Sequence, residues 1–166
     1  MTPRRRKLLQ AFTLIEALLA AVILAMSISA IVMPFTVGMA CESADGRRTL
    51  AVNLAQEMME EILTKPFLDP AGVMTLGPES GETRTTFNCI DDYNGFVEGD
   101  GQIRGFDGQL VTADAARGMT RRVTCAYVYV NGQDQFQVAS FIRVTVEVQW
   151  KNQSLVVLSR LVFGGH

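Results

Sequence analysis

Near the amino terminus the sequence carries the basic run Arg4-Arg5-Arg6-Lys7, then Phe12-Thr13-Leu14-Ile15-Glu16, and then only uncharged residues from Ala17 to Cys41. A helix needs about 20 mainly apolar residues to cross the hydrocarbon layer of a membrane. The segment 17–37 meets this requirement, with Pro34 as its only strong helix breaker. The sequence therefore predicts a membrane-spanning helix.

The charge of Glu16 stands at the edge of this apolar segment. A carboxylate inside a membrane span costs about 2.5–3.5 kcal/mol on insertion scales, so such a residue usually marks a partner or a function. The basic run before the span fixes its orientation, because Lys and Arg are retained in the cytoplasm. We therefore expect a single-pass protein of the cytoplasmic membrane, with its carboxyl-terminal part outside the cytoplasm.

The hexapeptide Ala11-Phe12-Thr13-Leu14-Ile15-Glu16, placed after a short basic leader, resembles the processing motif of type IV prepilins and type II secretion pseudopilins. Most members of that family carry Gly where this chain has Ala11. The resemblance implies that a prepilin peptidase cuts between Ala11 and Phe12 and methylates the new amino terminus of Phe12. It also implies that Glu16 pairs with the amino terminus of a neighbouring subunit. Such a head-to-tail contact, if it does not close into a ring, produces an open helical polymer.

The family resemblance further implies a role in assembly. The chain is expected to be a structural subunit, of the minor pseudopilin kind, in a type II secretion or type IV pilus-like filament that serves protein secretion. Its expected partners are other pilin-like subunits, the prepilin peptidase, an inner-membrane assembly platform and the membrane itself. The assembled form would be a filament in the cell envelope.

A row of small residues runs along the predicted span at every fourth position. Small residues at this spacing share one helix face and let helix backbones approach closely in lipid. The row is therefore a candidate for helix packing, although alanine is common in membrane spans for other reasons. Its members are Ala17, Ala21, Ala25 and Ser29.

Two other interpretations of the amino-terminal region stay open. A secretory signal ending before Cys41 would release a secreted or lipid-anchored binding module. Against it, the apolar region exceeds the roughly 7–15 residues of a signal core, and Gly38 stands where a lipoprotein signal is expected to carry Leu. An ordinary single-pass protein with an accidental motif is the remaining alternative.

The chain divides into five expected segments: a basic leader (1–11), a membrane and filament-core helix (12–40), its amphipathic continuation (41–66), a variable loop-rich region (67–118) and an antiparallel sheet (119–166). The continuation is predicted from apolar residues at steps of four, which form one helix face. We therefore expect an α+β, pilin-like fold in which the long helix packs on the sheet. The apolar residues of that face are Leu50, Leu54, Met58 and Ile62, flanked by Ala51, Ala55 and Met59.

Alternating apolar residues predict three strands in the last third of the chain. The first spans 121–131 and ends at the turn signal Asn131-Gly132, and the second spans 136–150 with its even positions apolar. The third spans 155–163, and we expect its odd positions, from Leu155 to Phe163, to face the core. In the loop-rich region only Thr83 to Ile90 is predicted to form a strand.

Acidic and amide side chains gather among glycines in the loop-rich region, and calcium prefers six to eight oxygen ligands in flexible loops. The spacing is not that of an EF-hand, and acidic turns are usually only solvated. Calcium is therefore the one cofactor that the sequence suggests, and otherwise none is expected. The candidate ligands are Asp91, Asp92, Asn94, Glu98 and Asp100.

The three cysteines allow one disulfide in an exported domain, between Cys89 and Cys125, or three buried thiols. Catalysis is not expected, because the one histidine is His166 and no nucleophile–base or metal-ligand motif occurs. Residues 1–11 carry four of the 15 Lys and Arg and none of the 17 Asp and Glu. The remainder is acidic, which argues against nucleic acid as a partner.

Overall fold

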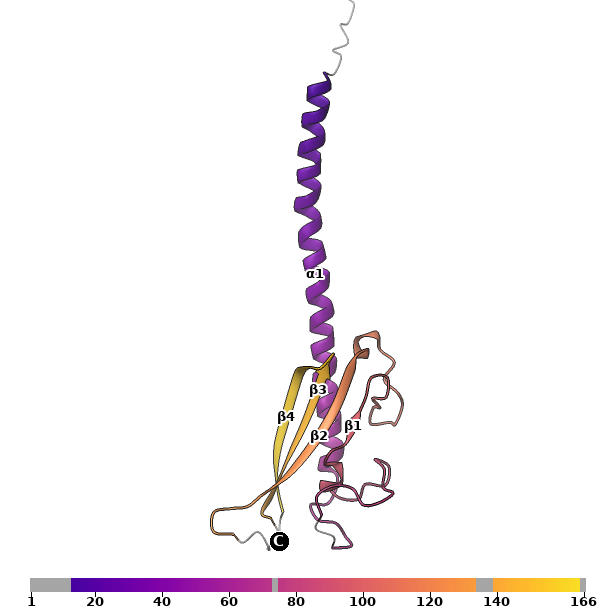
Figure 1. The fold of residues 1–166 in the computed structure, drawn as a ribbon, viewed down its shortest axis with the longest axis vertical. Helices are drawn as coiled ribbons and strands as arrows, with labels where there is room; N and C mark the ends of the chain where they lie inside the picture. Colours follow the sequence, from indigo (N-terminus) through magenta and orange to yellow (C-terminus); the bar gives the residue numbers. More distant parts are fainter. Residues whose placement is uncertain (1–12, 73–74, 134–138, 165–166) are drawn as a thin grey trace, which may run out of the picture. The chain divides into compact units, whose positions relative to one another are not determined.

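The computed structural model describes residues 13–72, 75–133 and 139–164. The chain separates between Ser43 and Ala44 into two compact units, which we describe in turn. Their elements are one long helix, α1 (Leu14–Leu63), two short 3-10 helices, η1 (Asp91–Tyr93) and η2 (Asp114–Ala116), and four strands (Figure 1).

The first unit consists of the amino-terminal part of α1. Every residue from 13 to 46 is exposed, and the helix is long and apolar enough to span a membrane. Its hydroxyl groups are satisfied within the helix: Ser27 donates to the carbonyl oxygen of Ile23 at 2.8 Å, and Thr36 to that of Met33 at 2.9 Å. Polar groups that are satisfied within their own helix suit a membrane-spanning segment, because lipid contains no water to bond them.

The second unit, the head, is built on an antiparallel sheet with the strand order β1-β2-β3-β4. These strands are β1 (Val97–Glu98), β2 (Met119–Val128), β3 (Phe141–Trp150) and β4 (Gln153–Phe163). Lys151 and Asn152 connect β3 to β4 with φ angles of 48° and 65°, the left-handed conformation that a two-residue hairpin turn requires. The predicted turn at Asn131-Gly132 is also present, with Gln133 N–H donating to the Val130 carbonyl at 3.0 Å.

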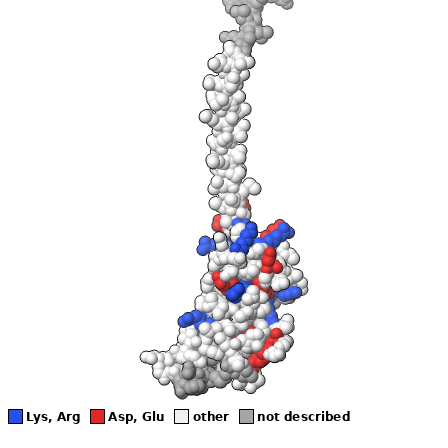
Figure 2. All heavy atoms as spheres, in the orientation of Figure 1, with Lys and Arg blue, Asp and Glu red and all other residues white. Residues whose placement is uncertain are grey.

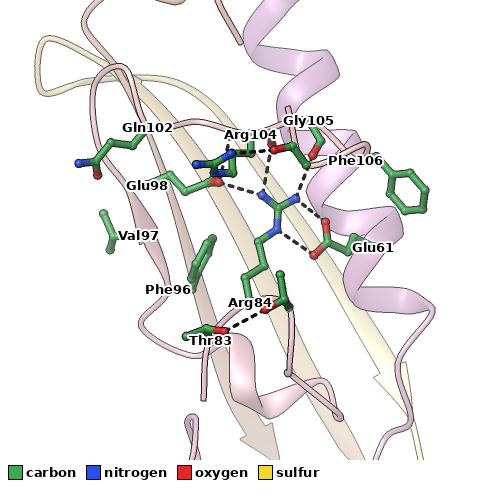
Figure 3. Close-up of a pocket in the computed structure, with 12 residues that line it drawn as sticks. Glu61, Thr83, Arg84, Phe96, Val97, Glu98, Gln102, Arg104, Gly105 and Phe106 are labelled. Carbon is green, nitrogen blue, oxygen red and sulfur yellow. Dashed lines mark hydrogen bonds and ion pairs between the residues drawn. The ribbon is translucent and has the colours of Figure 1, made fainter. Parts of the chain in front are cut away.

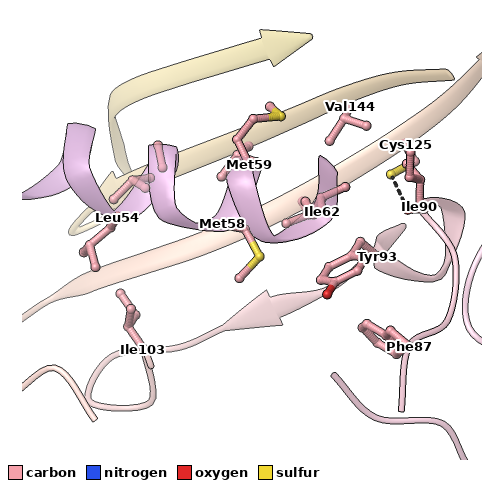
Figure 4. Close-up of a cluster of buried hydrophobic side chains, with 14 of the residues drawn as sticks. Leu54, Met58, Met59, Ile62, Phe87, Ile90, Tyr93, Ile103, Cys125 and Val144 are labelled. Atoms are coloured by element: carbon pink, nitrogen blue, oxygen red, sulfur yellow. Dashed lines mark hydrogen bonds between the residues drawn. The ribbon is translucent and has the colours of Figure 1, made fainter. Parts of the chain in front are cut away.

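The core of the head lies between the last turns of α1 and one face of the sheet (Figure 4). The predicted helix face is confirmed: of its seven residues, six are buried and Leu50 is half-buried. On β3 the even positions from Ile142 to Val148 are buried, as predicted, and on β2 the odd positions Val123 and Cys125 are buried. Phe87 and Tyr93 extend this core from the loop-rich region, with ring centroids 4.9 Å apart. The observed architecture is therefore α+β and pilin-like in layout.

The strand predicted over Thr83 to Ile90 is wrong, because this segment forms turns. The N–H groups of Thr86 and Phe87 both donate to the Thr83 carbonyl, at 2.7 and 3.0 Å. The Thr86 hydroxyl in turn accepts the N–H of Thr83 at 2.8 Å. Threonine hydroxyls offer the backbone a local alternative to a strand ladder, and here that alternative is the one adopted.

The predicted start of β3 also differs, since the strand begins at Phe141 rather than at Phe136, which lies outside the described residues. A larger correction concerns β4, whose even positions Val156, Leu158 and Val162 pack on the core. Directly paired residues of neighbouring strands point to the same side of a sheet. Because buried Val146 pairs with Leu158, the even positions of β4 face inward.

Leu155, opposite the register shift at Val148 and Gln149, packs on the core as predicted, but the other odd apolar positions of β4 are turned outward. Val157, Leu161 and Phe163 are 59%, 53% and 63% exposed. The prediction failed because β4 carries apolar residues at both parities, so alternation alone does not decide which side is buried. The result is an apolar row on the outer face of an edge strand.

Candidate functional site

The amino-terminal part of α1 is the first candidate surface, because it exposes large apolar side chains from Leu14 to Met39. Charged side chains gather instead over the head (Figure 2). The predicted packing residues Ala17, Ala21, Ala25 and Ser29 lie in this exposed helix, and the Ser29 hydroxyl donates to the Ala25 carbonyl at 3.0 Å. A continuous helix places residues four apart on one face. Their role in helix packing stays a prediction.

Glu16 lies in the first turn of α1. Its N–H is 3.1 Å from the Thr13 carbonyl oxygen and 3.4 Å from the Thr13 hydroxyl oxygen, so Thr13 takes the N-cap position. A carboxylate in the first turn also interacts favourably with the helix dipole. The predicted cleavage and methylation positions, Ala11 and Phe12, lie outside the described residues.

A buried charged network is the second candidate feature, and it lies wholly within the head (Figure 3). Arg121 is fully buried on β2, and its guanidinium pairs with Glu98 of β1, the Nε donating at 2.7 Å. It also donates to the carbonyl oxygens of Leu54 in α1, at 2.9 Å, and of Arg104, at 2.7 Å. One side chain thereby links the helix, two strands and a loop.

Arg84 continues this network from the turn at 83–86. It donates to both carboxylate oxygens of Glu61 and, at 2.8 Å, to Glu98. The hydroxyl of Tyr93 donates to Glu61 at 2.9 Å. Burial opposes ionisation of Glu61, but the hydrogen bonds from Arg84 and Tyr93 outweigh it and lower the pKa of this carboxyl group. The pKa of Tyr93 is raised by burial and by its bond to Glu61.

A cavity of about 490 Å³ opens beside β1 over this network. Its walls combine the paired charges of Arg84, Glu61 and Glu98 with apolar side chains, among them Val97 and Phe106 (Figure 3). Glu61, Arg84 and Glu98 in its wall are paired with one another, the Arg104 guanidinium donates to the Gly108 carbonyl at 2.8 Å, and its lining contains neither His nor Cys. We call this cavity the β1 groove.

The five predicted calcium ligands are not brought together. Glu98 belongs to the charged network, the Asn94 side-chain oxygen accepts the N–H of Cys125 at 3.0 Å, and Asp100 accepts that of Gly118 at 2.8 Å. Asp91 and Asp92 lie close to one another, in a group that does not include Glu98 or Asp100, and calcium binding stays a prediction.

Asp91 and Asp92 are instead buried beside the Cys89 thiol, close enough that the three could contact one ion. Their carboxylates already have partners: Asp92 accepts the N–H groups of Asn88 and Cys89 at 2.7 and 3.0 Å. Asp91 accepts the Tyr127 hydroxyl at 3.0 Å. Asp91 therefore anchors η1 to β2, and Asp92 anchors η1 to the preceding residues Asn88 and Cys89.

The predicted disulfide between Cys89 and Cys125 is absent, because both residues are buried free thiols. The Cys89 thiol donates to Asp91 at 2.8 Å and the Cys125 thiol to the Ile90 carbonyl at 3.4 Å, so each sulfur has its own partner. Burial raises the pKa of Cys125 to about 12 and raises that of Cys89 as well. Cys41 differs, since it is an exposed thiol on α1.

These environments predict that iodoacetamide will modify Cys41 in the folded, detergent-solubilised protein and will spare Cys89 and Cys125. At about pH 8, a thiol with a pKa of about 12 holds roughly a thousandfold less thiolate than free cysteine. Mass spectrometry should find one adduct on the folded chain and three after unfolding without reductant. A single adduct on the unfolded chain would reveal a disulfide and contradict the free thiols.

The buried pair of Arg121 and Glu98 was missed by the sequence interpretation. The sequence does contain a signal for the inward position of Arg121. Like Val123 and Cys125 it is at an odd position of β2, and alternate residues of a strand point to the same side. Comparison of the chain with protein families, curated proteins and solved structures gives no match. The function must therefore be argued from these residues alone.

Proposed function

We propose that this protein is a structural subunit of a type II secretion or type IV pilus-like filament, of the minor pseudopilin kind. The observation that carries the proposal is the placement of Glu16 in the first turn of α1, where the apolar part of the helix is exposed, four residues after Phe12 of the processing motif. The pilin-like layout of the head supports it. The apolar surface needs lipid or other helices to cover it, and a filament core supplies the latter.

In this proposal the helix first holds the subunit in the cytoplasmic membrane, with the head outside the cytoplasm. Prepilin peptidase removes residues 1–11 and methylates Phe12. The new ammonium group at Phe12 and the carboxylate of Glu16 then neutralise one another between adjacent subunits, because neither charge is stable alone in an apolar core. An inner-membrane platform draws the helix into the growing filament.

The mature amino terminus tests this proposal. We expect mass spectrometry of membrane-extracted protein to find N-methylated Phe12, and to find the intact leader in cells that lack prepilin peptidase. A terminus at Cys41 would indicate the released binding module instead, although such a cut falls inside the continuous helix α1. An intact leader in both strains would overturn the proposal.

A further inference from the structure

The charged groups in and directly behind the wall of the β1 groove carry more positive than negative charge. They are the guanidinium groups of Arg84, Arg104 and Arg121 and the carboxylates of Glu61 and Glu98. Arg84 and Arg121 both pair with Glu98, so one carboxylate serves two cations. A cleft with an excess of one charge and low-dielectric walls concentrates ions of the opposite sign. The groove therefore favours an occupant that brings a negative charge.

Arg104 is the cation of the groove that such an occupant can reach. Its side chain is exposed and forms no ion pair with any residue that the structure describes. The bond from its Nη1 to the Gly108 carbonyl holds one side of the guanidinium and leaves other donors available. Asp107, in the same loop, does not line the groove, and its carboxylate accepts the N–H of Gln109 at 3.0 Å.

β1 also has an open backbone edge beside the groove. Val97 pairs with Arg122 of β2 at a position between hydrogen-bonded pairs, because the Val123 N–H donates to the Phe96 carbonyl at 2.9 Å. In an antiparallel ladder the N–H and C=O of such a residue point away from the paired strand. Within the described part of the chain they have no other backbone partner. An extended peptide adds to an edge of this kind through main-chain hydrogen bonds.

Apolar side chains flank the open edge. Val97 and Phe106, which both line the groove, are 48% and 71% exposed. They lie on opposite sides of the Arg84 guanidinium (Figure 3). The groove thus offers apolar area, a backbone edge and a cation together, which suits an extended peptide better than a small anion.

We propose that the β1 groove binds an extended acidic segment of another protein, which adds to the edge of β1 at Val97 and places a carboxylate at Arg104. Apolar side chains of the segment then cover Val97 and Phe106. Arginine binds carboxylates through charge-assisted hydrogen bonds, and these specify an acidic partner. The contact goes beyond the proposed function and does not depend on leader processing or on filament assembly.

Peptide binding to the full chain in detergent tests this contact. The probe is a fluorescein-labelled peptide, Ser-Ile-Glu-Ile-Glu-Ile with a blocked carboxyl terminus, and its matched form carries Gln in place of both Glu residues. We expect fluorescence polarisation to show at least about threefold tighter binding of the Glu peptide, on the scale of a partly exposed ion pair. This preference should weaken as salt is raised.

Arg104→Gln should remove the preference for the Glu peptide and leave binding of the Gln peptide unchanged. The matched control is Arg143→Gln, which changes an exposed arginine of β3 outside the groove and should keep the preference. Equal binding of the two peptides, a preference that survives Arg104→Gln, or no binding of either peptide would overturn the contact.

Two further peptides, N-methylated at the Ile or at the Glu residues, test the pairing with β1. Only one edge of an added strand faces β1, so exactly one of these two peptides should lose binding. If both or neither lose binding, the addition of a strand at Val97 is wrong.

Discussion

Replacing Glu16 with glutamine is expected to leave membrane insertion and leader cleavage intact and to reduce filament assembly by at least about tenfold. Glutamine keeps the size and most hydrogen-bonding capacity of the side chain but removes its charge. The amino terminus of the neighbouring subunit would then enter an apolar core unpaired. Breaking a buried pair by removing one partner typically costs about 3–5 kcal/mol, and about 1.4 kcal/mol is already tenfold in an equilibrium.

The matched control for this prediction is Glu42→Gln. Glu42 is the next acidic residue along α1 and is also exposed, but it lies beyond the apolar segment. Assembly is measured as the fraction of protein recovered in sheared filaments, and cleavage as the mass of the mature chain. If Glu16→Gln assembles as well as Glu42→Gln, the pairing of Glu16 with an amino terminus is wrong.

The helix and its buried face were predictable from the sequence because both depend on local spacing. Apolar residues at steps of four from Leu50 to Ile62 specify one face of one element, and that face is buried. The inward positions of β2 and β3 follow from alternation in the same way. On β3 every odd position after Phe141 is polar, so only the even positions can form the buried side.

The alternation of apolar residues did not predict the buried side of a strand where that side depends on pairing with a neighbouring strand. On β4 both parities carry apolar residues, and the inward set is chosen by pairing of Leu158 with buried Val146. The 83–90 segment has strand-forming residues, but its threonine hydroxyls close local turns. The ion pairs of the charged network join residues 14 or 23 positions apart, such as Arg84 with Glu98 and with Glu61, and such pairings leave no local signal in one sequence.

Replacing Arg121 with methionine is expected to lower the free energy of unfolding of the head by about 3–5 kcal/mol, which is a large share of the roughly 5–15 kcal/mol of a typical domain. The change leaves Glu98 buried with Arg84 as its one remaining ion-pair partner, and it removes a donor from the Leu54 carbonyl. Urea unfolding of the full chain in detergent can be followed by the fluorescence of Trp150, the single tryptophan.

Arg117→Met provides the matched control, because the ion pair of Arg117 with Asp114 is exposed, with side chains 84% and 89% accessible. Exposed pairs contribute less than about 1 kcal/mol. Equal effects of the two substitutions would show that burial adds nothing to the Arg121 pair.

The double variant Arg121→Met, Glu98→Leu then distinguishes two possible causes of the lost stability. If the buried Glu98 carboxylate, left with Arg84 alone, dominates the loss, its removal should restore more than half of the lost stability, since a buried ion pair can be replaced by apolar residues at little cost. If stability is not restored, the dominant loss is the missing donor to the Leu54 and Arg104 carbonyl oxygens. Arg121 would then act mainly as a hydrogen-bond anchor that holds the loop of the β1 groove against the helix.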